Sequence, residues 1–166
     1  MVCRFAPKTR SNPADAVASP ANLNWIVEPA RPGDLPAIAE LVAAVGGDLE
    51  DLLFEQFLVG RVGSTGRGKI VGCCRLKPYS GFHELASLAV DGEWRNSGVG
   101  RSLVAGLVAW YEGPIYLICE DDVVDFFQKF GFVLIPMPEM PAGLQAKWQR
   151  YVDQLGHINV MRRYAD

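Results

Sequence analysis

Apolar residues in the first third of the chain recur mainly at helical spacing. Residues 25–27 are predicted to form a short strand, and Asp34 is suited to cap the helix that follows. The glycine pair at 46–47 would end that helix, and residues 49–56 are interpreted as a second helical piece. The apolar positions are Leu35, Ile38, Leu41, Val42 and Val45 in the first helix, and Leu52, Leu53 and Phe57 in the second.

The middle of the chain has the pattern of an antiparallel meander. Three apolar runs are predicted to be strands, and the segments between them contain the glycine and proline typical of turns. The strands are expected at 57–62, 70–76 and 84–90, and the turns at 63–68 and 78–82. Because short turns join neighbouring strands in antiparallel pairs, this part should form one sheet.

The second half of the chain alternates between helix and strand. Residues 99–111 show helical periodicity, and Pro114 would prevent that helix from continuing. Beyond it we expect a strand at 115–119, a helix at 123–130, a strand at 132–135, a helix at 144–155 and a strand at 157–162. The order predicts a mixed α/β (α+β) domain whose first half is largely antiparallel.

Length and composition fit one globular domain of 166 residues, nearly half of them apolar. The formal net charge of −3 provides no basic field for nucleic acid, and no apolar run approaches the ~20 residues of a membrane helix. The cysteines lack zinc-like spacing and are interpreted as reduced thiols of a cytoplasmic protein without a metal site. They are Cys3, Cys73, Cys74 and Cys119. Oligomeric state is left open, with a homodimer as one option.

The N-terminal segment 1–24 differs in composition from the rest of the chain. It is rich in Ser, Ala and Pro and carries mostly basic charge. We interpret it as a flexible extension that precedes a domain of residues 25–166, with an organelle transit peptide as the alternative.

The sharpest local signal is the segment Arg95-Asn96-Ser97-Gly98-Val99-Gly100-Arg101-Ser102, between a predicted strand and a predicted helix. Glycines let the backbone turn tightly and approach a ligand closely. Amides at a helix start have no intrahelical acceptor, and the helix dipole adds partial positive charge there. With Arg95 and Arg101 beside them, these amides predict an anion site suited to a diphosphate.

Two other phosphate-binding motifs are excluded. A dinucleotide fingerprint requires a third glycine where Leu103 stands. The segment 63–69 matches GxxxxGK, but Ile70 follows instead of Ser or Thr, and the next element is a strand. We therefore interpret 63–68 as a hairpin turn.

Two motifs carry a family resemblance. The stretch 88–100, Leu-Ala-Val-Asp-Gly-Glu-Trp-Arg-Asn-Ser-Gly-Val-Gly, resembles the acetyl-CoA motif of the GNAT superfamily of N-acetyltransferases. The stretch 125–132, Asp-Phe-Phe-Gln-Lys-Phe-Gly-Phe, resembles its second signature. The chain is also similar to the single-domain branch related to amino-acid N-acetyltransferases, including N-acetylglutamate synthases. The features are Pro78-Tyr79, the run 84–90, Phe126-Phe127 and the loop 138–141.

The resemblance implies a GNAT fold and the use of acetyl-CoA as co-substrate. In that fold a mostly antiparallel sheet of six to seven strands is splayed in the middle and flanked by about four helices. Pantetheine would add to the sheet like a strand. The residues implied to bind the cofactor are Leu88, Ala89, Val90, Arg95, Asn96, Ser97, Gly98, Val99, Gly100, Arg101, Ser102 and Phe127.

Acetyl transfer to an amine requires a neutral nitrogen and therefore a base. The resemblance points to Glu84, because the superfamily often carries a glutamate base on this strand. His83 is the alternative, although it would face the other side of a regular strand. Relatives often place a tyrosine acid at position 127, where this chain has Phe127. Either no dedicated acid acts, or the acid is Cys119, Tyr79 or Tyr151.

The acceptor is expected to be a small primary amine or an amino acid. Arg75, Lys77 and Tyr79 precede Glu84, and a cation there would suit an acceptor carboxylate. Long basic side chains on a strand also often simply face water. Two other functions stay open: acetylation of protein N-termini or lysines, and a non-catalytic module that senses coenzyme A.

Overall fold

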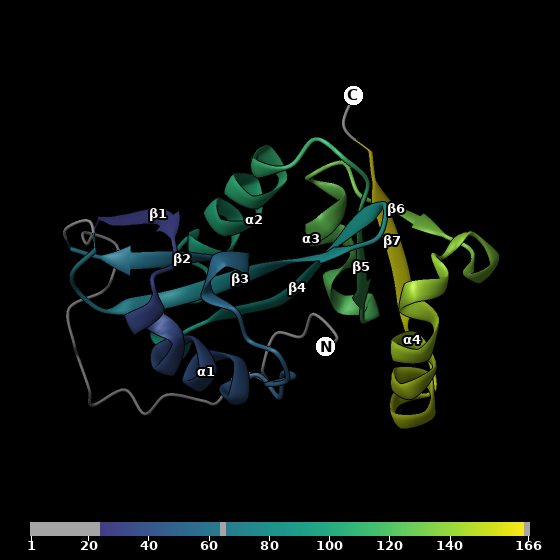
Figure 1. Ribbon diagram of the computed structural model, residues 1–166, viewed down its shortest axis with the longest axis horizontal. Coiled ribbons are helices and arrows are strands. Elements are labelled where there is room, and N and C mark those ends of the chain that lie inside the picture. Colours follow the sequence, from purple (N-terminus) through teal and green to yellow (C-terminus); the bar gives the residue numbers. More distant parts are fainter. Residues whose placement is uncertain (1–23, 64–65, 165–166) are drawn as a thin grey trace.

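The computed structural model describes residues 24–63 and 66–164. Its core is one seven-stranded sheet in the order β1-β2-β3-β4-β5-β7-β6 (Figure 1). The strands are β1 (Trp25–Pro29), β2 (Phe57–Val62), β3 (Ile70–Tyr79), β4 (Phe82–Val90), β5 (Ile115–Cys119), β6 (Val133–Ile135) and β7 (Asn159–Arg163). The helices are α1 (Leu35–Ala44), α2 (Val99–Trp110), α3 (Val124–Gln128) and α4 (Ala142–Leu155). The predicted segment 1–24 lies, apart from residue 24, outside the described residues.

The sheet opens in its middle, between β4 and β5. Strands β1 to β4 pair in antiparallel order, and β5, β7 and β6 form a second antiparallel group. The two groups join in parallel at only two positions, His83 with Ile115 and Glu84 with Tyr116. Beyond Glu84 the strands diverge, so β4 keeps β3 on one side and has no strand partner on the other. The predicted splayed, mostly antiparallel sheet is confirmed.

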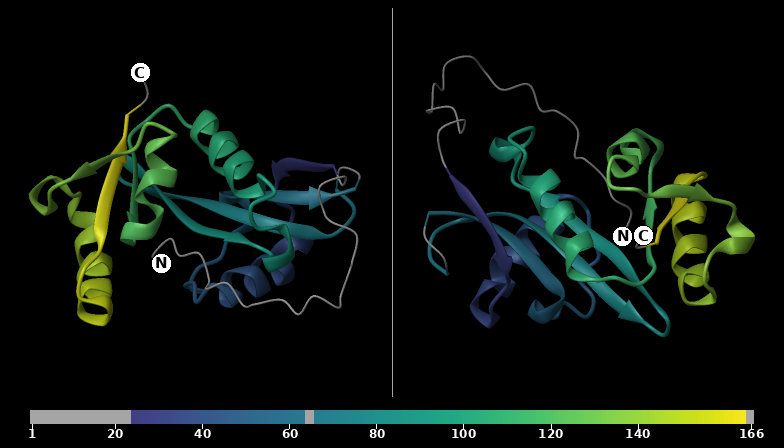
Figure 2. Two further views of the ribbon diagram at one scale, coloured as in Figure 1. Left: turned by 180° about the vertical axis from the view of Figure 1, so that it is seen from behind. Right: turned by 90° about the horizontal axis from the view of Figure 1, so that it is seen from above.

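The helices cover both faces of the sheet. Helices α1 and α2 lie on opposite faces of the first strand group, and α4 lies beside the second group (Figures 1 and 2). Gly60 and Gly72 let α2 pack closely, because a β-carbon at these positions would lie 3.0 and 2.8 Å from Cγ1 of Val99. The start of α2 is thereby held directly on β2 and β3.

Strand β4 carries a bulge near its C-terminal end. Its pairing with β3 shifts by one residue between Arg75–Ala86 and Cys73–Ala89. Ser87 in the bulge has φ of 50°, a left-handed conformation that is costly for a residue with a β-carbon. A bulge re-aims the backbone of its strand, and this one lies where β4 has lost contact with β5.

One local prediction about the first third of the chain is wrong, and a second holds for the position of the residue but not for its side-chain bond. Residues 49–56 are not a helix, except for a 3-10 turn at Phe54–Gln56. Arg75 explains this, because its guanidinium binds the carbonyls of Glu50 and Asp51, which a helix would have used internally. Asp34 precedes α1 as predicted, but its side chain accepts bonds from Arg31 N and Arg61 rather than capping the helix.

The remaining elements occur where the periodicity predicts them, with small differences at their ends. Strand β3 runs on to Tyr79, because the turn to β4 needs only residues 80–81. Gly81 supplies the positive φ, 85°, that this turn requires. Cys73 and Cys74 point to opposite faces, into the cluster under α1 and the cluster under α2. The predicted hairpin between β2 and β3 is confirmed by their antiparallel pairing.

Candidate active site

The loop before α2 is held by a buried tryptophan. Trp94 is 6% exposed and packs edge-on against Trp25, with 6.2 Å between ring centroids. At the start of the loop, Asp91 accepts a bond from the Glu93 amide at 3.1 Å and pairs with Lys69 at 2.7 Å. Within the loop, the amides of Arg95 and Ser97 donate to the carbonyls of Gly92 and Trp94 at 3.5 and 3.4 Å, so the loop is also held by its own backbone.

Backbone conformation at Gly98 directs the first amides of α2 outward. Gly98 has φ of 99° and is the N-cap residue, and Asn96 is also left-handed at 62°. The first helical hydrogen bond runs from Ser102 N to Gly98 O at 3.0 Å. The amides that precede Ser102 in the helix therefore have no acceptor within α2. They point together at the positive end of the helix dipole, which is an arrangement that binds anions.

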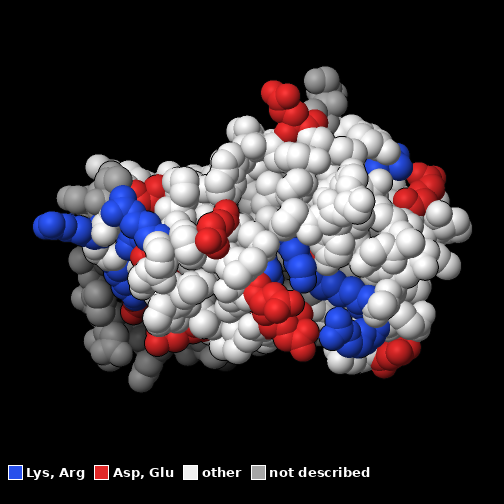
Figure 3. All heavy atoms as spheres, viewed as in Figure 1, with Lys and Arg blue, Asp and Glu red and all other residues white. Residues whose placement is uncertain are grey.

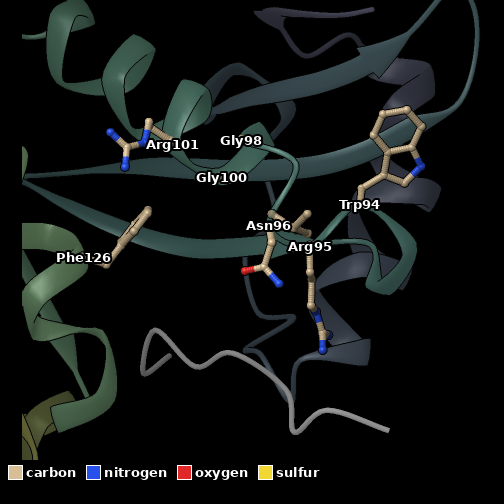
Figure 4. A pocket seen from close by; sticks show the side chains of 8 residues that line it. Trp94, Arg95, Asn96, Gly98, Gly100, Arg101 and Phe126 are labelled. Carbon is tan, nitrogen blue, oxygen red and sulfur yellow. The ribbon is translucent and has the colours of Figure 1, made fainter. Parts of the chain in front are cut away.

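A pocket of about 350 Å³ lies against these amides. Arg101, on the first turn of α2, and Phe126, from α3, border it from opposite sides, and the Arg95 side chain points away from α2 (Figure 4). The lining residues are Val90, Trp94, Arg95, Asn96, Gly98, Gly100, Arg101 and Phe126. The pocket thus combines helix amides, an exposed cation and an apolar wall.

The bulged end of β4 leads into this pocket. Leu88, Ala89 and Val90 are buried, and Val90 itself lines the pocket. The edge of β4 that faces β5 carries no strand pairing along this stretch. An extended ligand chain that starts at the pocket would therefore meet unpaired backbone groups of a strand.

Glu84 lies on the opposite side of the sheet from α2, at the point where the strands begin to part. Its side chain is fully buried, and each carboxylate oxygen has a donor. The Tyr79 hydroxyl donates to Oε2 at 3.0 Å, and the Lys147 ammonium forms an ion pair with Oε1. Lys147 comes from α4, so the pair connects the two strand groups. Sequence analysis assigned no role to Lys147, because a basic residue on an amphipathic helix normally faces water.

Arg75 is close to Glu84 but has other partners. It is 4% exposed, and its Nε donates to Gln56 Oε1 at 2.7 Å. Its remaining nitrogens donate to the carbonyls of Glu50 and Asp51. Arg75 therefore fastens the loop before β2 onto the sheet. Lys77, the other predicted cation, lies at the rim of the site, with its Nζ 5.8 Å from the centre of the Tyr79 ring.

The charges around Glu84 affect one another. Burial, followed by the charge of Glu84 and the hydrogen bond to it, raises the pKa of Tyr79 above its ordinary value. Burial alone would raise the pKa of Asp48, but the Glu50 amide and the charges of Lys147 and Arg150 outweigh it, so this pKa is lowered. The side chains around Glu84, including Tyr79, Arg75 and Lys147, therefore form a buried polar site that contains both positive and negative charges.

Surface charge elsewhere is mixed. On the face shown in Figure 3, Lys and Arg side chains lie in small groups next to Asp and Glu side chains. Within the described residues, no helix is long and apolar enough to cross a membrane, and no three potential metal ligands come together. An anion at the start of α2 would therefore be held by local amides and the arginines that line the pocket rather than by a long-range field.

Residues 54–134 match the family model of the acetyltransferase (GNAT) domain. These residues include β4, the loop, α2 and α3, which together build the pocket. This segment, nearly half of the chain, belongs to the GNAT family of acetyltransferases. No curated protein matches this sequence.

Solved GNAT structures share the fold over most of the chain. Rv2747 from Mycobacterium tuberculosis, crystallised with CoA and NLQ, is 25% identical, with a TM-score of 0.66 over 85% of this chain and 99% of that one. N-acetylglutamate synthase from Neisseria gonorrhoeae, with coenzyme A and N-acetyl-glutamate, is 20% identical, with a TM-score of 0.67 over 86% of this chain. This chain spans 35% of that synthase. Ard1 from Thermoplasma volcanium is 20% identical, with a TM-score of 0.60 over 86% of this chain and 98% of that one.

Within this GNAT domain, six of the predicted cofactor residues line the pocket, and two lining residues, Trp94 and Phe126, were not predicted. Phe127, predicted as a cofactor contact, is fully buried in the core, and the centre of its ring lies 5.9 Å from the centre of the Phe132 ring. The helical repeat explains the difference, because adjacent residues on α3 point in different directions. The six are Val90, Arg95, Asn96, Gly98, Gly100 and Arg101.

The alternative acid and base residues are spread over the GNAT domain. His83 lies on the face away from Glu84, where its ring centre is 3.9 Å from that of Tyr111 and burial lowers its pKa. Tyr151, on α4, packs in an apolar cluster with Ile118 of β5 and with Ile158, which directly precedes β7. Of the candidate acids, Tyr79 donates a hydrogen bond to Glu84.

Proposed function

We propose that the chain transfers the acetyl group of acetyl-CoA to a primary amine. The observation that carries the proposal is the pocket at the start of α2, which opens along the unpaired edge of β4. The diphosphate would accept bonds from the α2 amides and from Arg101. Coenzyme A bound to the structural neighbours from Mycobacterium tuberculosis and Neisseria gonorrhoeae supports this choice of ligand.

The pantetheine arm would run along β4 between the two strand groups. Backbone groups of Leu88, Ala89 and Val90 would hold it as an added strand. Amides next to the bulge at Ser87 would lie beside the thioester carbonyl, where charge develops during attack. One such oxyanion contact is typically worth about 3 kcal/mol in the transition state.

Glu84 would act as the general base. It would take a proton from the acceptor ammonium, directly or through a water, and the neutral nitrogen would attack the acetyl carbon. The carbon–sulfur bond then breaks, and coenzyme A leaves as thiol once it has gained a proton. The buried position of Glu84 on the face of the sheet away from α2 supports this role, because the acceptor would approach from the face opposite the diphosphate. Tyr79, whose hydroxyl contacts Glu84, is the nearest candidate for returning a proton.

The acceptor would be a small amine, such as an amino acid. The cluster around Glu84 is closed by the loop that Arg75 fastens and by α4, which favours a small molecule over a folded protein. Tyr79 and Lys77 at the rim would contact it, and Lys77 offers a cation for an acceptor carboxylate. Arg75 would support this site through the loop.

Release of free thiol from acetyl-CoA tests the proposal. The purified chain would be incubated with acetyl-CoA and a panel of amino acids, polyamines and short peptides. Thiol release that depends on one class of amine, with the acetylated amine found by mass spectrometry, is the expected result. Binding of coenzyme A without release of thiol by any amine would instead favour the sensing module, and absence of binding would refute the whole assignment.

A further inference from the structure

The Lys147 ammonium lies next to Glu84, where the proposed mechanism would put the amine of the acceptor. Its ammonium contacts Oε1 of Glu84, and its side chain is 13% exposed while that of Glu84 is fully buried. A protonated primary amine against the general base is also the first state of the acceptor in the proposed reaction. The protein thus holds one of its own amines where a substrate amine would bind.

Helix α4 is packed so that Lys147 keeps this position. One turn before it, Gly143 lies so close that a β-carbon there would be 3.3 Å from Tyr79 and 3.4 Å from Phe82. Leu144 is fully buried against Phe82. Residues 143 and 147 share one face of the helix, so these contacts aim Lys147 at β4.

The other lysines of the described chain lie elsewhere. Lys69 is 60% exposed and pairs with Asp91, and Lys129 is exposed on the end of α3. Lys77 lies over the Tyr79 ring at the rim. Among the described lysines, only Lys147 is paired with Glu84, and it is the least exposed of those in ion pairs. Non-enzymatic acetylation would favour the exposed lysines, whereas acetylation that depends on Glu84 would favour Lys147.

We propose that Lys147 is an internal acceptor and that the chain acetylates its Nζ. This inference rests on the proposed acetyl transfer. Glu84 takes a proton from the ammonium, and the flexible four-carbon stem lets the neutral nitrogen swing to the thioester. The nitrogen bonds to the acetyl carbon, the carbon–sulfur bond breaks, and coenzyme A leaves as thiol with the second proton. Because the lysine and the thioester would belong to one protein–cofactor complex, the step would be unimolecular, which favours it over attack by amines in solution.

Self-acetylation would change the site after one turnover. The product is a neutral amide, so the ion pair between α4 and β4 is lost while the Tyr79 hydrogen bond to Glu84 stays. Each chain would take up a single acetyl group at this position.

Mass spectrometry of the intact, folded chain with acetyl-CoA and no added amine tests the inference. The expected product carries one acetyl group, located on the peptide that contains Lys147, with Lys69 and Lys129 modified at least about tenfold more slowly. Lys147→Arg keeps the cation and should abolish the product. Glu84→Gln should slow its formation by about 10²-fold or more. Circular dichroism and thermal unfolding of each variant establish that it folds.

Three outcomes would overturn the inference. An unmodified Lys147 in a chain that acetylates added amines would refute it and leave the proposed function intact. Equal labelling of Lys147 and the exposed lysines, unchanged in Glu84→Gln, would show chemical acetylation. Failure of both self-labelling and amine acetylation, with no thiol released, would refute the proposed function and this inference with it.

Discussion

Gly72 on β3 and Val99 at the start of α2 are packed so closely that a β-carbon at position 72 would lie 2.8 Å from Cγ1 of Val99. The same β-carbon would lie 3.2 Å from the carbonyl oxygen of Ala89 on β4. One glycine therefore sets the distance between the helix that starts at the pocket and the strand edge that leads away from it.

Gly72→Ala should destabilise the fold and weaken coenzyme A binding together. The added methyl group pushes α2 away from the sheet, and overpacking of this kind costs about 1–3 kcal/mol. Urea unfolding and calorimetry with coenzyme A measure the two effects. Gly33→Ala is the matched control, because a β-carbon there meets nothing within 4 Å. The double variant Gly72→Ala/Val99→Ala should recover part of the loss, and full additivity would contradict the proposed contact.

Gly98→Ala should weaken coenzyme A binding about tenfold, or ~1.4 kcal/mol. Its φ of 99° is strained for alanine, so the loop would relax and turn the α2 amides away from the diphosphate. Isothermal titration calorimetry gives the affinity. Gly156→Ala imposes similar strain, at φ of 81°, beyond the end of α4. Both variants should lose stability, and an equal loss of affinity in both would argue against a specific role for Gly98.

Arg101→Ala should reduce affinity for coenzyme A more than Arg95→Ala. Both arginines line the pocket, but Arg101 stands on the first turn of α2 beside the helix amides, whereas the Arg95 side chain points away from α2 (Figure 4). We expect about a tenfold loss for Arg101→Ala, with a weaker dependence of affinity on salt, because one charged contact is removed. Titrations at low and high ionic strength measure both. A larger effect of Arg95→Ala would mean that the diphosphate lies on the other side of the loop.

Glu84→Gln should lower kcat by about 10²- to 10⁴-fold and leave coenzyme A affinity unchanged. The amide preserves the shape of the side chain and can still accept a bond from Tyr79, but it cannot take a proton. Steady-state thiol release with the best amine of the panel measures kcat. Glu112→Gln, an exposed residue beyond α2, is the control for loss of a carboxylate. Unchanged turnover at neutral pH in Glu84→Gln would remove Glu84 from the mechanism.

Glu28→Gln should make stability less dependent on pH. Burial would raise the pKa of Glu28, but bonds from Arg61 and the Gly66 amide outweigh it and lower the pKa below its ordinary 4.5. The carboxylate therefore stabilises the fold above pH 4.5, and this contribution is lost as the pH falls through the lowered value. Urea unfolding near neutral pH and at about pH 3 should show that the difference in free energy of unfolding between wild type and variant becomes smaller at acid pH. A difference in unfolding free energy that is the same at both pH values would contradict the stabilising role of the Glu28 carboxylate.

The local sequence was sufficient to predict the structural features that depend on residues close together in the chain. The strands and helices followed their periodicity, and the glycines of the loop before α2 marked its conformation because few other residues tolerate a positive φ. Residues 49–56 show where this fails. Their helical pattern was overridden by Arg75, about 20 residues further along, which takes the carbonyls that a helix needs.

The amino-acid sequence by itself indicated a diphosphate-type loop, since the glycines and arginines that mark it lie within a few residues of one strand–helix junction. Only the tertiary structure decided which groups surround Glu84. Lys147 is 63 residues away from Glu84, and the packing of α4 against the β3–β4 hairpin brings the two together. The choice between Phe126 and Phe127 as the pocket wall likewise depended on how α3 is rotated against the core. Periodicity places an element in the chain, but burial of its apolar face against distant residues decides what its polar side chains meet.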